Sequence, residues 1–165
     1  MHLRSMYCIL LRIFGFTFVA LSGNAWGWGQ PCAENGNKYV LKNATAYDKS
    51  TDRTWKRCAE GQTWKESAGC FGTPKLITFA EAEAMEADGW RLPTKAELQT
   101  LVTENCKEPA INTDAFPGIS PNTHRYWSST PSGTEYLWTI KFSNGQADGA
   151  KRDILSAARL VRNGQ

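Results

Sequence analysis

The chain has 165 residues, of which 41% are hydrophobic and 21% are charged, and its formal net charge is +3. These values are typical of one soluble globular domain, and no low-complexity segment or repeat is present. A charge this close to neutral argues against general nucleic-acid binding, which requires a basic surface to neutralise phosphates. Any site for a polyanion therefore has to be a local patch.

The first 25 residues have the pattern of a secretory signal peptide. Arg4 and Arg12 precede an apolar run of nine residues, and small and polar residues follow it. A transmembrane helix requires roughly 18 consecutive apolar residues, about twice this run. We therefore expect cleavage after Ala25, with cleavage after Gly27 as the alternative. The product is predicted to be periplasmic or secreted.

Cleavage leaves 17 basic residues, 16 acidic residues and four cysteines. An even number of cysteines in an exported chain predicts two disulfides, for which three pairings exist. Cys58 and Cys70 flank a compact loop that contains glycines, which favours their pairing and leaves Cys32 with Cys106. The gaps are longer than the spacings of zinc knuckles, so a zinc site is disfavoured. Cys32 does not follow a lipoprotein cleavage pattern, and no membrane anchor is expected after cleavage.

The mature chain divides into an exposed lead-in over residues 26–37 and a domain over residues 38–165. Apolar and turn residues in the domain predict two helices followed by antiparallel strands. The helices are expected from Thr78 to about Ala87 and from Thr94 to about Asn105, because each begins with a capping box. Both helices are expected to pack on one face of a sheet. Strands are predicted over residues 38–42, 53–57, 126–129, 136–142 and 157–162, with a hairpin-like turn at 143–146.

Three separated motifs occur in a fixed order: GWRLPTKAEL at 89–98, YWSST at 126–130 and ARLVR at 158–162. Together with residues 54–64 they resemble the Lcl C-terminal domain family over residues 38–162. The resemblance implies an α+β domain that is C-type-lectin-like, with two helices, a twisted antiparallel sheet, long irregular loops and two disulfides. It also implies that the first and last strands meet.

The family includes the globular head of a bacterial collagen-like adhesin, which binds sulfated glycosaminoglycans, and many stand-alone relatives. The resemblance therefore implies an adhesin-like binding role. Because this chain has no collagen repeat, the identity of its own partner is left open.

An enzymatic role is the competing interpretation, because formylglycine-generating enzymes share the broader fold and carry a string similar to RLPTKAE. Those enzymes use a reactive cysteine pair late in the chain, whereas no cysteine follows Cys106 here. His124 is the only histidine of the mature chain, and no Gly-x-Ser-x-Gly elbow surrounds Ser128 or Ser129. We therefore assign no catalytic residue.

The long stretch between residues 107 and 125 contains oxygen-bearing side chains that can hold calcium, namely Glu108, Asn112 and Asp114. The string Glu-Pro-Ala at 108–110 departs from the Glu-Pro-Asn triplet of sugar-binding C-type lectins, and no Trp-Asn-Asp string occurs. We therefore expect no cofactor and no metal, with a structural calcium ion as the alternative.

Three residues are the candidate ligand contacts: Trp64, Lys151 and Arg152. Trp64 lies in a polar loop, and the two cations follow a stretch at 145–149 that predicts a flexible, exposed loop. The other candidates are expected to have structural roles; these are Trp90, Trp127, Trp138, Arg91 and Arg162.

The sequence thus predicts an exported, non-enzymatic binding module whose partner is an acidic glycan or an envelope or host-surface protein. Two alternatives stay open: an enzyme of the formylglycine-generating type or a degenerate relative of one, and an accessory subunit of a surface filament.

Overall fold

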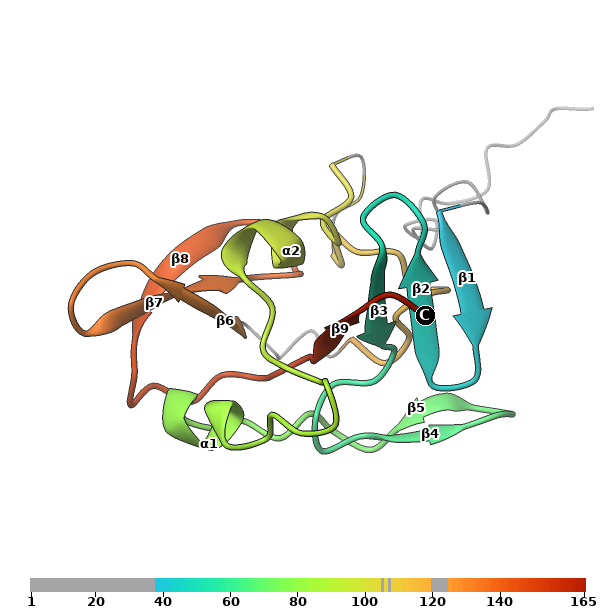
Figure 1. Cartoon of the computed structure of the whole chain (residues 1–165), viewed down its shortest axis with the longest axis horizontal. Coiled ribbons are helices and arrows are strands. Elements are labelled where there is room, and N and C mark those ends of the chain that lie inside the picture. Colours follow the sequence, from blue (N-terminus) through green and yellow to red (C-terminus); the bar gives the residue numbers. More distant parts are fainter. Residues whose placement is uncertain (1–37, 105, 107, 120–124) are drawn as a thin grey trace, which may run out of the picture.

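The computed structural model describes residues 38–104, 106, 108–119 and 125–165, and these form nine strands and two short helices (Figure 1). The elements in chain order are β1 (Tyr39–Lys42), β2 (Thr45–Asp48), β3 (Arg53–Lys56), β4 (Thr63–Lys65), β5 (Gly69–Phe71), α1 (Phe79–Glu83), α2 (Lys95–Gln99), β6 (Tyr126–Pro131), β7 (Tyr136–Ile140), β8 (Ala147–Lys151) and β9 (Val161–Asn163). The predicted α+β class is confirmed. The predicted single sheet is wrong, because the strands form three antiparallel sheets with the orders β1-β2-β3-β9, β4-β5 and β6-β7-β8.

The four-stranded sheet joins the two ends of the domain. β9 pairs with β3, so that Val161 lies opposite Trp55. The expectation that the first and last strands meet is therefore wrong, since β1 and β9 lie on opposite edges of this sheet. Alternation along the strands turns Ala46 and Trp55 inward, where both are fully buried. The other face, which we call the open face, carries the half-buried side chains of Thr45, Tyr47 and Arg162.

The helices cover opposite faces of the three-stranded sheet, which corrects the prediction that they share one face. Tyr126 and Trp127 are neighbours in β6, are both fully buried and therefore point to opposite faces. Phe79 of α1 packs edge-on against Trp127, with ring centroids 5.8 Å apart. Leu98 of α2 belongs instead to the buried cluster that contains Tyr126. The sheet is thus enclosed on both sides.

The helices start where the sequence predicts but end earlier. Thr78 and Thr94 are the N-caps, and both capping boxes form. α1 stops at Glu83 and α2 at Gln99, whereas longer helices were expected. The apolar residues that suggested longer helices, Met85 and Leu101, reach the core from turns. No helix among the described residues is long and apolar enough to cross a membrane.

The stretch at 145–149 is not the flexible loop that its glycines suggested. Lys141 N–H donates to the Gln146 carbonyl at 2.8 Å, which confirms the hairpin turn. From Ala147 onward the chain pairs with β7 along its whole length. A glycine suits position 149 because an added Cβ would lie 2.8 Å from the Ser132 hydroxyl oxygen. Position 149 is therefore closely packed rather than flexible.

One carboxylate connects α2 to the four-stranded sheet. Glu97 accepts hydrogen bonds from Arg91 at 2.7 and 2.8 Å and from Arg53 at 2.8 Å, and it also accepts from the Thr94 N–H. Burial alone would raise the pKa of Glu97, but the bonds from Arg91, Arg53 and Thr94 outweigh it and lower the pKa to about 2. Arg91 therefore has the structural role that the sequence predicts.

We expect Glu97→Gln to lower the free energy of unfolding by about 2 to 3 kcal/mol at pH 7, since each pKa unit corresponds to about 1.4 kcal/mol. A depressed pKa stabilises the fold above the unfolded-state pKa, and that stabilisation is lost as pH falls toward 2. The difference between wild type and variant should therefore shrink between about pH 5 and pH 2. Denaturant unfolding at several pH values measures it.

Glu81 provides the matched control, because its carboxylate closes the other capping box and makes no ion pair with a described arginine. Glu81→Gln should cost clearly less than Glu97→Gln. Equal costs would mean that capping, and not the arginine pair, accounts for the effect.

The predicted disulfide between Cys58 and Cys70 is present, with Cα atoms 5.3 Å apart. It ties the end of β3 to the β4–β5 hairpin. The second predicted pair stays a prediction: Cys106 is not a free thiol, but Cys32 lies outside the described residues.

Replacement of both cysteines in Cys58→Ser/Cys70→Ser should lower the free energy of unfolding by about 3 kcal/mol, because the closed loop is short. Peptide mapping without reduction should show this pair and, if the prediction holds, Cys32 with Cys106. A double variant as stable as the oxidised wild type would contradict the role assigned to this bond.

Candidate functional site

One depression of the surface is lined by two indole rings. It is a hollow of about 220 Å³ at the junction of the four-stranded sheet and the β4–β5 hairpin. We call it the tryptophan hollow; the residues of its wall used below are Thr45, Lys56, Glu60, Gln62, Trp64 and Trp90. Trp64 was predicted from the sequence as a ligand contact, and Trp90 was assigned to the core.

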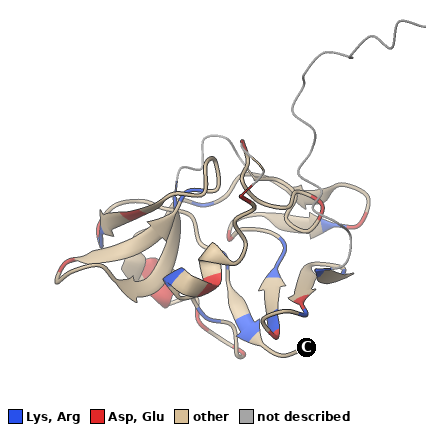
Figure 2. Cartoon of the chain, turned by 90° about the horizontal axis from the view of Figure 1, so that it is seen from above, with Lys and Arg blue, Asp and Glu red and all other residues tan. Residues whose placement is uncertain are grey.

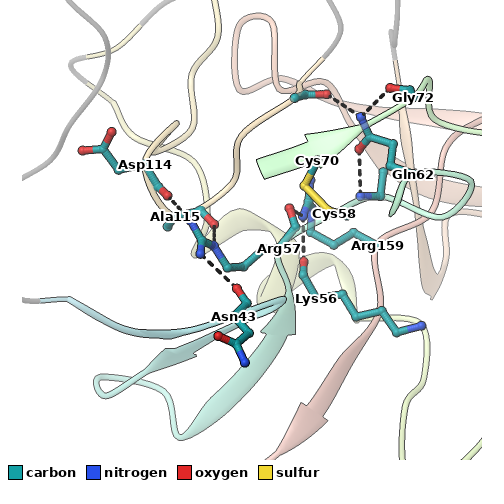
Figure 3. Close-up of a disulfide and its surroundings, with 12 residues drawn as sticks. Asn43, Lys56, Arg57, Cys58, Gln62, Cys70, Gly72, Asp114, Ala115 and Arg159 are labelled. Atoms are coloured by element: carbon teal, nitrogen blue, oxygen red, sulfur yellow. Dashed lines mark hydrogen bonds between the residues drawn. A yellow bond between two sulfur atoms is a disulfide. The ribbon is translucent and has the colours of Figure 1, made fainter. Parts of the chain in front are cut away.

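Arg57 packs against the indole ring of Trp64. The guanidinium carbon of Arg57 lies 4.0 Å from the centroid of the indole, a cation–π contact. The same guanidinium donates to the backbone carbonyls of Asn43, Asp114 and Ala115 at 2.7 to 3.0 Å (Figure 3). One side chain thus joins the β1–β2 turn, the loop at 112–116 and the hairpin that carries Trp64. These contacts therefore hold this wall of the hollow in a fixed position.

Trp90 forms the other aromatic wall and is only partly buried. The Arg162 guanidinium carbon lies 4.9 Å from its ring centroid, and the Lys56 Nζ lies 5.5 Å from it. Trp90 also packs against the buried cluster that contains Trp127. It therefore has both roles, because one part of the ring supports the core and another lines the hollow. The sequence motif indicated only the first.

The polar groups of the tryptophan hollow are largely paired with one another. Lys56 and Glu60 form an ion pair at 2.9 Å. The Gln62 amide donates to the carbonyls of Gly72 and Gly118 and accepts from the Ala59 N–H, which fixes its orientation. The indole N–H of Trp64 is buried and has no hydrogen-bond partner among the described residues. Buried donors are normally satisfied, so water or a ligand oxygen is its expected partner.

A second hollow of about 130 Å³ lies on the open face of the four-stranded sheet, and we call it the sheet hollow. Its wall includes Lys42, Thr45, Tyr47, Thr54 and Arg162. The Tyr47 hydroxyl bonds to Asp52 at 3.0 Å, and this bond raises the pKa of Tyr47, so the phenol stays neutral. No sequence pattern indicated this hollow, because its residues alternate along four different strands.

Lys151 and Arg152, the other two predicted contacts, lie at the far end of the molecule, near α1 rather than β4 (Figure 1). They line a shallow hollow of about 270 Å³ together with Glu135 and Asp153. Two carboxylates beside two cations leave this surface without excess charge. The structure therefore does not bring these two cations together with Trp64.

Basic and acidic residues are interspersed over the described chain, with basic positions on the strands beside the C-terminus (Figure 2). Arg162 is at the surface, whereas Arg159 is fully buried and bonds to the carbonyls of Lys56 and Arg57. Burial lowers the pKa of Arg159. The two arginines do not form one patch.

The remaining candidates are engaged in structural contacts. Ser128 donates to the Trp138 carbonyl at 2.6 Å, and Ser129 donates to the Pro93 carbonyl at 3.3 Å. Asn112 caps its own loop by accepting from the Ala115 N–H at 2.8 Å. Within the described residues no group of three His, Cys, Asp or Glu side chains could hold a metal ion. His124 lies outside the described residues.

Comparison with known proteins agrees with the motifs. No curated protein matches the chain. The family model of the Lcl C-terminal domain matches residues 44–162, a span that includes both helices, the disulfide and both walls of the tryptophan hollow. The chain therefore belongs to the Lcl C-terminal domain family.

Proposed function

We propose that this protein is an exported, non-enzymatic binding module that recognises a glycan at the cell envelope or at a host surface through the tryptophan hollow. The observation that carries the proposal is the pair of fixed, partly exposed indoles, Trp64 and Trp90, with paired polar side chains between them. Indole faces bind the apolar faces of sugar rings, and the polar groups beside them bind hydroxyls.

The arrangement of the hollow supports binding more than catalysis. Its one carboxylate, Glu60, is engaged with Lys56, and the described wall offers no second acid and no nucleophile beside a base. We propose in addition that the α+β domain is a variant of the C-type lectin fold, as the family motifs imply. A protein partner is the second candidate, favoured by the exposed Val40 and Leu41 on the edge strand β1.

The test is a glycan array probed with the purified exported protein, with and without chelator, followed by titration calorimetry with the strongest binder. Trp64→Ala should weaken that binding by at least about tenfold, because loss of a stacking anchor costs about 1.4 kcal/mol or more. Binding that disappears with chelator would revive the calcium alternative.

Phe71→Ala is the matched control. Phe71 is an exposed aromatic residue on the same hairpin, but it does not line the hollow. This variant should keep wild-type affinity. An array without binders, or equal losses in the two variants while both stay folded by near-ultraviolet circular dichroism, would rule out glycan recognition through this hollow.

A further inference from the structure

The tryptophan hollow and the sheet hollow adjoin. Thr45 on β2 belongs to the wall of both. Strand pairing places Thr45 opposite Lys56 of the first hollow, and it places Thr54 of the second hollow opposite both Tyr47 and Arg162. Arg162 also stacks on Trp90 of the first hollow. The two depressions are therefore parts of one groove across the open face of the sheet.

The length of this groove follows from the strand spacing. Neighbouring strands lie about 4.8 Å apart, so the sheet hollow, whose wall reaches from Lys42 on β1 to Arg162 on β9, spans roughly 14 Å across the sheet. The tryptophan hollow adjoins it at Thr45 and Lys56, where β2 and β3 approach the β4–β5 hairpin. A single sugar ring would fill only one part of the groove. The groove fits an extended chain.

The charges differ between the two hollows. In the tryptophan hollow, Lys56 is neutralised by Glu60. In the sheet hollow, Lys42 and Arg162 line the wall, and neither makes an ion pair with a carboxylate of the described residues. The Nε atom of Arg162 is buried and has no hydrogen-bond partner among the described residues. An anionic group of a ligand in the sheet hollow would supply the counter-charge that these two cations lack among the described residues.

We propose that the groove binds an unbranched oligosaccharide of at least three rings, with uncharged rings between Trp64 and Trp90 and one anionic substituent beside Lys42 and Arg162. The inference deepens the proposed function and rests on it. A densely sulfated chain fits less well, because the described wall of the tryptophan hollow offers its sulfates no unpaired cation. The groove therefore selects sparse charge rather than a polyanion.

The test is titration of the whole exported protein with a panel of unbranched gluco-, galacto- and N-acetylglucosamine oligosaccharides of one to five rings. Each length is supplied neutral, with one terminal carboxylate, and fully sulfated. The best series should gain at least about tenfold in affinity between one and four rings. Within that series the singly acidic chain should bind tightest and the sulfated chain weakest.

Two variants test the role proposed for each hollow in recognising charge. Arg162→Gln should remove the preference for the singly acidic chain, so that the affinity falls more for the acidic chain than for the neutral one. Glu60→Gln should raise the affinity for the sulfated chain. Lys151→Gln is the matched control, since this cation lies outside the groove, and it should change neither preference.

Some outcomes would overturn the groove alone, and others would overturn the proposed function as well. If Trp64→Ala abolishes binding but affinity is the same for one ring and four, or if the sulfated chain binds tightest, the extended groove is wrong and the tryptophan hollow stands. A loss of affinity in Arg162→Gln that is equal for neutral and acidic chains would also contradict the groove. If no member of the panel binds, glycan recognition itself fails.

Discussion

The buried guanidinium of Arg159 is the interaction on which the site depends. This side chain is fully buried and packs between the rings of Phe116 and Tyr126, with centroid distances of 5.0 and 5.8 Å. A buried charge is costly unless it is hydrogen-bonded, and here it bonds to the last carbonyl of β3 and to the next one along the chain. The backbone at Lys56 and Arg57 is thereby fixed.

The consequences follow along the chain from that fixed point. The side chain of Arg57 extends from this backbone and packs against the ring of Trp64. Cys58 is the next residue and anchors the hairpin through its disulfide with Cys70 (Figure 3). Lys56 faces the opposite way into the hollow, where it meets Glu60. The buried contact of Arg159 thus fixes the positions of three neighbouring residues that shape the surface. This arrangement explains how short strands and short helices can present a rigid wall.

Local signals were predicted from the sequence because they act within a few residues. The capping boxes at Thr78 and Thr94 and the hairpin turn after Lys141 are confirmed for that reason. β8 was missed because Ala-Asp-Gly-Ala-Lys contains no β-branched or aromatic residue, so only its pairing with β7 makes it a strand. The distribution of the strands among three sheets likewise depends on long-range pairing that periodicity does not encode.

The candidate site was only partly predictable for the same reason. Trp64 could be chosen because its glycine-flanked, polar surroundings suggested exposure. Its partner Trp90 lies in a motif that suggested packing, and the placement of both in one hollow depends on tertiary contacts. Lys151 and Arg152 looked like a basic patch because Glu135, which shares their hollow, is distant from them along the chain.

The open face of the four-stranded sheet has a bearing on how this domain can diversify. Side chains on that face alternate with those that fill the core, so Lys42, Thr45 and Tyr47 can be replaced without disturbing Ala46 or Trp55. Residues of both kinds share the same short strands, yet selection can act on them separately. Descendants of one ancestral domain could therefore acquire new recognition properties by point substitution while their interior is inherited unchanged.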